Sequence, residues 1–189
     1  GQAYSLLTSV WPHWYIGCPD RAIEAANECQ RVGVLAATFT QVVAAWKGFM
    51  YAELGDISGG LECTRQAAAA IVAGLGQFSV LEAQLHLELR AGHVAQATTL
   101  LQTMNQDPQH PAIFEVDSLL RARAEVALAQ GQPDQALAAA QAHVDGLRAH
   151  GLWTTLPEAL FGRAQAWLLA GQPAQAEAAL AEALAQAEA

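Results

Sequence analysis

The sequence predicts an all-α fold in which about five helical hairpins stack into a right-handed α-α superhelix, or solenoid. Three observations predict it. Ala, Leu and Gln dominate the 189 residues, and only 14% of the chain is charged against 53% hydrophobic, which suits closely packed helices. Alternation of period two, typical of a half-buried strand, is nowhere sustained. A ten-residue pattern that begins with glycine occurs five times at a nearly fixed period, as in stacked repeats.

The repeated pattern starts at Gly17, Gly55, Gly92, Gly131 and Gly171, so successive copies are 38, 37, 39 and 40 residues apart (55−17, 92−55, 131−92, 171−131). A glycine takes positive φ at a helix end without a steric penalty, and in three copies a proline two positions later opens the next helix. Each copy therefore predicts the turn between the first helix (A) and the second helix (B) of one hairpin.

Small residues follow each glycine by five positions, where helix B is expected to cross close to helix A. They are Ala22, Gly60, Ala97, Ala136 and Ala176. Residues four and then three positions further along fall on the same helical stripe. They are Ala26, Thr64, Leu101, Ala140 and Leu180, followed by Cys29, Ala67, Met104, His143 and Ala183.

The first hairpins divide residues 1–104. Pro12 lies within the first expected helix, residues 3–16, where an interior proline costs about 3 kcal/mol, so we expect this helix to be kinked or to begin late. Its helix B should run over 19–31. The second hairpin pairs 37–54 with 57–74 and is broken by glycines in 74–76, and the third pairs 79–90 with 94–104.

A Pro-rich link, residues 105–111 (NQDPQHP), precedes the last two hairpins. The fourth hairpin pairs 114–130 with 133–150, and the fifth pairs 155–170 with 173–188. Thr154 or Thr155 could cap the helix that begins the fifth hairpin. These hairpins, at roughly 3–31, 37–74, 79–104, 114–150 and 155–188, make residues 1–189 a single repeat domain. Because no Met precedes the first helix, we expect a fragment of a larger protein.

Charge and cysteine usage exclude several classes of partner. The formal charge is −9 with a single lysine, Lys47, so the phosphate backbone of a nucleic acid would be repelled. Cys18, Cys29 and Cys63 form no CxxC pair, so neither a disulfide framework nor a zinc site is indicated, and a reducing, cytoplasmic compartment is expected. No apolar run reaches the roughly 18 residues of a membrane span.

Small residues recur in the paired helices, as at Ala124, Ala127, Gly131 and Ala136. In this spacing essentially the whole chain resembles tetratricopeptide repeat (TPR) proteins. The repeats are a few residues longer than the usual length of about 34. Gly60 and Thr64 depart from the usual alanine and aliphatic residue. The phrases WYIGCPDRA, GQPDQA and GQPAQA are further similar to repeat regions that follow ATPase modules in bacterial signal transduction. MalT-like transcriptional activators and ATPase-linked adenylate or guanylate cyclases are such proteins.

Motifs that carry chemistry are missing. The chain contains no GxxxxGK[ST] phosphate-binding loop and no GxSxG nucleophile elbow, and its six histidines show no HxxxH or HExxH spacing. We therefore predict no enzymatic activity, no cofactor and no metal site. Any ATPase or cyclase chemistry that the resemblance implies would lie outside this chain.

Candidate binding residues lie on the A helices, because in TPR proteins these helices line the concave groove. The nearest candidates are Trp11 and Trp14, Trp46 and Phe49, Glu82 and His86, Arg121 and Glu125, and Phe161 and Gln165. Arg121 could hold a carboxylate or a vicinal diol through two hydrogen bonds, alone or with Arg123. The alternative is that the aromatic residues belong to the core and that Arg121 pairs with Glu82 or Glu125 as a solvated ion pair.

Two functions fit these residues. The first is a non-catalytic scaffold that binds a protein or peptide partner in its groove. The alternative is a small-molecule-sensing domain of a bacterial signal-transduction ATPase, transcriptional regulator or cyclase, as the resemblance implies. A homo-oligomer could form through a terminal hairpin, and the N-terminal end is favoured because Glu177, Glu182 and Glu188 make one side of the last helix polar.

Overall fold

The computed structural model describes residues 17–32, 37–70, 75–106 and 115–188. Over these residues the chain forms nine α-helices and one π-helical turn, and none of them lies in a strand. The prediction of an all-α fold is therefore confirmed. The first predicted helix with Pro12, the groove candidates Trp11 and Trp14, and most of the Pro-rich link lie outside the described residues.

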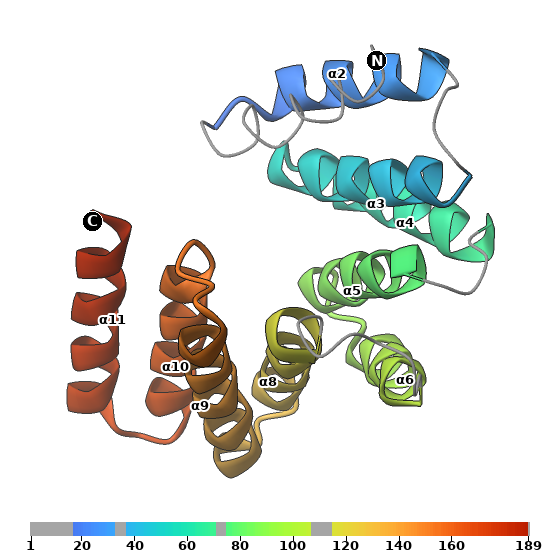
Figure 1. Ribbon diagram of the computed structural model, residues 1–189. Helices are drawn as coiled ribbons and strands as arrows, with labels where there is room; N and C mark the ends of the chain where they lie inside the picture. Colours follow the sequence, from blue (N-terminus) through green and yellow to red (C-terminus); the bar gives the residue numbers. More distant parts are fainter. Residues whose placement is uncertain (1–16, 33–36, 71–74, 107–114, 189) are drawn as a thin grey trace. The chain divides into compact units, whose positions relative to one another are not determined.

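The chain divides into two compact units, Gly1–Gly92 and His93–Ala189 (Figure 1). The first contains α2 (Pro19–Val32), α3 (Ala37–Glu53), α4 (Ile57–Ala70) and α5 (Leu75–Arg90). The second contains α6 (Val94–Asn105), the π-turn η1 (Glu115–Leu119), α8 (Leu120–Ala129), α9 (Pro133–His150), α10 (Leu156–Leu169) and α11 (Pro173–Ala187). The A helices are α3, α5, α8 and α10.

All five predicted turn glycines have positive φ, between 67° at Gly131 and 91° at Gly55. After each of the last two, the next amide closes the helix by donating to the carbonyl five residues back: Gln132 to Ala127 and Gln172 to Trp167, both at 2.9 Å. Pro133 and Pro173 then open α9 and α11 as predicted. The second copy has no such proline, and its Asp56 side chain accepts a hydrogen bond from the Gly59 amide at 2.8 Å, which caps α4.

The predicted B-helix stripe is buried at every position except Leu101, which is half-buried, and Leu180, which is exposed. The structure also explains why position 60 is a glycine where the other copies have alanine. A Cβ at Gly60 would lie 2.5 Å from the Gly48 carbonyl oxygen, and a Cβ at Gly48 would lie 2.8 Å from the Gly60 oxygen. Helices α3 and α4 thus cross backbone against backbone, a closer approach than an alanine allows.

The structure differs from the predicted helices in three details, one of them a boundary. Helix α5 begins at Leu75 instead of residue 79, because a glycine at the second helical position, Gly76, disturbs few of the backbone bonds that a first turn makes. The fourth A helix opens as the π-turn η1. Thr155 precedes α10 but makes no capping bond; its hydroxyl instead donates backward to the Leu152 carbonyl at 3.4 Å.

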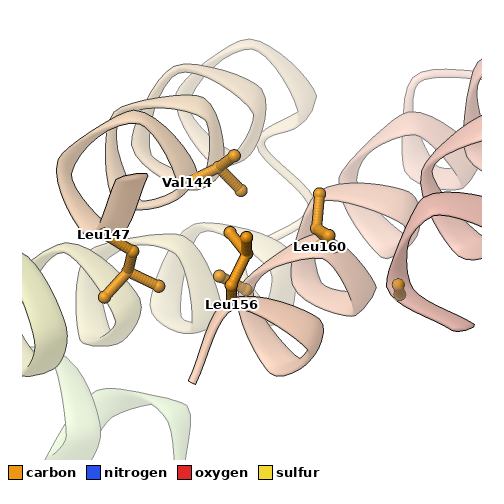
Figure 2. Close-up of a cluster of buried hydrophobic side chains, with 6 residues drawn as sticks. Val144, Leu147, Leu156 and Leu160 are labelled. Atoms are coloured by element: carbon orange, nitrogen blue, oxygen red, sulfur yellow. The ribbon is translucent and has the colours of Figure 1, made fainter. Parts of the chain in front are cut away.

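Each unit has its own core. In the first, α2 packs on α3 through Ala22, Ala26, Val43 and Met50, and α3 packs on α4 and α5. In the second, α9 and α10 pack through a cluster of aliphatic side chains (Figure 2). Its labelled members are Val144, Leu147, Leu156 and Leu160.

Candidate functional site

In the first unit the predicted groove residues Phe49 and His86 are in contact. Their ring centroids are 5.3 Å apart and the rings are tilted by 56°. Each residue lies six positions before its turn glycine (55−49, 92−86), so equivalent positions of α3 and α5 meet. A second equivalent pair, Glu53 and Arg90, forms an ion pair between the same helices. The A helices of this unit therefore lie side by side in repeat register.

Trp46, on α3, packs as a core residue more than as a groove residue. The side chain is half-buried and packs against two hydrophobic clusters, one around Val43 and one around Ala83. It lies nine positions before its glycine, as do the buried Ala83 and Ala122 in the following repeats. This contact pattern matches the alternative that assigned aromatic residues to packing. Glu82 is half-buried on α5.

In the second unit Arg121 of α8 contacts two carboxylates. Its Nη1 donates to Glu158 of α10 at 3.1 Å, and its Nε lies 3.8 Å from Glu125 on the next helical turn. The pairing with Glu125 was the alternative interpretation, whereas Glu158 was not foreseen. Arg123 does not join this cluster, because it donates twice to the side-chain oxygen Oδ1 of Asn105, at 3.1 and 2.6 Å. The proposed anion site of Arg121 with Arg123 has no support in this arrangement.

A buried histidine of α9 interacts with the same cluster and was missed as a functional candidate. His143 is 3% exposed, and its Nε2 is buried without a hydrogen-bond partner. Burial lowers the pKa of His143 to about 4. Nearby charges have smaller effects on this pKa: Asp117 and Glu125 raise it, and Arg121 lowers it. His143 is thus neutral at pH 7. Its place on the predicted buried stripe was the one signal available in the sequence.

The remaining pair, Phe161 and Gln165, lies on α10. Phe161 is 51% exposed and Gln165 is also exposed. With a repeat of 40 residues, Phe161 occupies the position of Arg121 and Gln165 that of Glu125 (161−40, 165−40). Since α8 and α10 pack against each other, an exposed aromatic ring and a charged cluster occupy equivalent places on neighbouring A helices. We define the A-helix face of this unit as Arg121, Glu125, Glu158, Phe161 and Gln165.

Two further ion-pair networks serve packing. Arg65 of α4 donates to both oxygens of the buried Glu88 on α5, at 3.0 and 3.1 Å. Glu182 of α11 accepts from Arg148 of α9 and from Arg163 of α10, the latter at 2.8 Å. Both networks join helices of one unit. Neither was visible in the sequence, because their members come from different helices.

Within the described residues, no group of three or more His, Cys, Asp or Glu side chains is arranged to hold a metal ion. Cys18, Cys29 and Cys63 are free thiols. None of the helices in the described part of the chain has the length and apolar character needed to cross a membrane.

Comparison with known proteins places the fold. No protein-family model and no curated protein sequence matches this chain. Among solved structures, it is similar to a putative kinesin light chain of Podosopora anserina with nearly identical TPR-like repeats, at 17% identity and a TM-score of 0.59, covering 98% of this chain and 94% of that one. MamA from Desulfovibrio magneticus RS-1 is similar at 12% identity and a TM-score of 0.57, covering 100% and 96%.

A tetratricopeptide repeat protein from Parabacteroides merdae is also similar, at 16% identity and a TM-score of 0.51, covering 98% of this chain and 80% of that one. Identities this low show the fold alone. The chain therefore has the fold of TPR-like helical repeats, as the resemblance implied.

Proposed function

We propose that this chain is a non-catalytic scaffold that binds a protein or peptide segment on the exposed side chains of its A helices. The observation that carries the proposal is Phe161, a large aromatic side chain left 51% exposed beside the helix that bears Arg121. Exposed aromatic anchors next to charged groups are typical of protein-binding surfaces. The lack of catalytic motifs in the sequence supports a binding role.

The charge of the A-helix face favours a basic residue in the partner. Arg121 already lies near Glu158 and Glu125, so a carboxylate of the partner would have to displace one of them. A lysine or arginine would instead meet two carboxylates, those of Glu125 and Glu158, beside the single guanidinium of Arg121. We therefore expect a segment that places an apolar residue on Phe161 and a cationic residue near Glu158.

Selection from a random peptide library displayed on phage tests this proposal, with the whole chain as bait. We expect selected peptides to combine an aromatic or aliphatic residue with a Lys or Arg. Fluorescence anisotropy should show that Phe161→Ala weakens their binding by at least tenfold, since anchor residues contribute about 2 kcal/mol or more. Trp153→Ala is the matched control, because Trp153 is equally exposed (57%) but lies between α9 and α10. Equal affinity for wild type and Phe161→Ala would remove this face as the site.

We place the scaffold in the cytoplasm, where its three free thiols would stay reduced. The alternative function, small-molecule sensing in a bacterial signalling ATPase, transcriptional regulator or cyclase, is supported by the sequence resemblance alone. A small-molecule ligand would be expected to raise the melting temperature of the whole chain, and Phe161→Ala would then test the same face.

A further inference from the structure

Among the buried residues of α9 only His143 is polar. The equivalent positions of the other four copies hold Cys29, Ala67, Met104 and Ala183, all of which are buried as well. His143 is 3% exposed, yet its Nε2 atom has no hydrogen-bond partner. A buried polar atom without a partner costs stability and is uncommon in folded proteins. Every other copy of the repeat packs without a ring here, so packing alone does not require the imidazole.

Charged groups act on His143 from the elements that pack on α9. Asp117 of η1 and Glu125 of α8 favour the protonated imidazole, whereas Arg121 of α8 disfavours it. Glu158 of α10 accepts a hydrogen bond from Arg121 at 3.1 Å. The carboxylates on this side therefore outnumber the guanidinium, and a protonated imidazole would be drawn toward η1 and α8.

The other charged residues close to this part of α9 pair with one another. Arg163 of α10 donates to Glu182 of α11 at 2.8 Å. On α9 itself, Asp145 and Arg148 lie one turn apart, with 3.9 Å between the nearest oxygen and nitrogen atoms. The groups that respond to a charge on His143 are thus those of η1 and α8.

The π-turn η1 is the element next to His143 that opens most easily. The fourth A helix begins with this turn, whereas α3, α5 and α10 are α-helical from their first described residue. The amides of a first turn have no acceptor within their helix, and a π-turn is a short irregular piece of one. Few backbone bonds are therefore lost when η1 opens. Because η1 packs on both α8 and α9, its opening would admit water to the imidazole.

We propose that His143 is an acid-sensitive latch on the fourth hairpin. At neutral pH the uncharged imidazole stays packed beside η1 and α8. Once protonated, it moves toward Asp117 and Glu125, and η1 opens together with the first turn of α8 while α10 and α11 stay folded. Since Arg121 and Glu125 belong to the A-helix face, acid also changes the charge of that face. The latch is a property of the chain itself and does not rest on the proposed function.

Amide hydrogen exchange followed by mass spectrometry tests the latch on the whole chain at pH 7.5 and 5.5. Protection factors are corrected for the intrinsic pH dependence of exchange. In wild type the protection of residues 115–125 should fall about tenfold between these pH values, as linkage gives for an imidazole whose pKa falls from 6.5 to about 4 on burial. The protection of α10 and α11 should be retained.

His143→Met is the test variant, because Met104 fills the equivalent buried position of α6. We expect this variant to keep the protection of residues 115–125 at pH 5.5. His150→Gln, at an exposed position of the same helix, should behave as wild type. Circular dichroism at both pH values establishes that the variants are folded, and His143→Leu replaces His143→Met if the latter is not.

Three results would overturn the proposal. The first is unchanged protection of residues 115–125 in wild type at pH 5.5. The second is the same loss of protection in the folded variant at position 143 as in wild type. The third is an equal loss in α10 and α11, which would mean that acid unfolds the unit as a whole.

Discussion

His143 shows how one side chain couples burial to the pH dependence of folding. It lies on the core stripe of α9, is almost fully buried and has an Nε2 without a partner. A buried imidazole without a hydrogen bond to its charged form favours neutrality. Around it lie Asp117, Arg121 and Glu125, whose effects on its pKa partly cancel.

Because the pKa of His143 falls from 6.5 to about 4 on folding, the unfolded chain binds the proton first as the pH drops. The stability that neutral His143 contributes is complete above pH 6.5 and is lost as the pH falls toward 4. The loss is of order 3 kcal/mol, at about 1.4 kcal/mol for each unit of pKa. We expect His143→Leu to flatten this part of the profile in urea unfolding between pH 7.5 and 4.5. His150→Gln, at an exposed position, should follow wild type; parallel profiles for His143→Leu and wild type would contradict this explanation.

Gly60 and Gly162 allow the effect of steric crowding on stability to be compared with the effect of helix propensity. Gly60→Ala would place a Cβ 2.5 Å from a carbonyl oxygen of Gly48, whereas nothing lies within 4 Å of a Cβ at Gly162 in α10. We expect Gly60→Ala to destabilise the fold by about 1–3 kcal/mol through overpacking. Gly162→Ala should stabilise it by about 0.5–1 kcal/mol, because alanine favours the helix. Melting temperatures measured on both variants check the contrast, and a stabilised Gly60→Ala would show that α3 and α4 can separate at little cost.

At the scale of the element, α11 is held by charge as well as by alanine packing. Glu182 lies between Arg148 of α9 and Arg163 of α10, both of which donate to it. Its packed side chains are small, and the bridge adds a charged contact with each of the two preceding helices. The half-buried site makes the bridge worth more than an exposed ion pair.

We therefore expect Glu182→Ala to cost about 1–3 kcal/mol, because it leaves two guanidinium groups without this acceptor. Amide hydrogen exchange in α11 should quicken more than exchange in α8. Glu177→Ala removes an exposed carboxylate from the same helix and serves as the control, with an expected change within about 0.5 kcal/mol. Equal effects of the two substitutions would assign the loss to helix propensity or net charge.

At the scale of the whole molecule, the repeats should respond to damage locally, because each hairpin of a repeat protein packs only on its neighbours. Ala136 lies at a tight crossing of α8 and α9, in a cluster with Ala124 and Ala127. Ala136→Leu overpacks this crossing and should cost about 1–3 kcal/mol. Hydrogen exchange followed by mass spectrometry should show faster exchange in α8, α9 and α10, with protection of α3 and α4 retained. Uniform loss of protection along the chain would mean that the two units unfold as one.

The sequence by itself determined the helical hairpins, their turns and most of the inward stripe of the B helices, Leu101 and Leu180 excepted. This was possible because a turn glycine, the proline after it and a stripe at spacings of four and three are local signals, each set by backbone sterics or helix geometry within a few residues. The five positive-φ glycines and the buried Ala22, Ala136 and Ala176 follow from those signals alone. Phe49 and His86, which the sequence offered only as separate groove candidates, are in contact because both lie six positions before a turn glycine.

Tertiary structure alone decided the electrostatics and the close contacts. Three contacts join residues from different helices: Glu158 with Arg121, Glu182 with two arginines, and Gly60 against Gly48. The periodicity of one helix does not say how the neighbouring helix is rotated about its own axis. The pKa of His143 is lowered for the same reason, since desolvation depends on everything packed around the side chain. Local backbone rules place the elements, whereas burial and charge pairing arise only once separate helices meet.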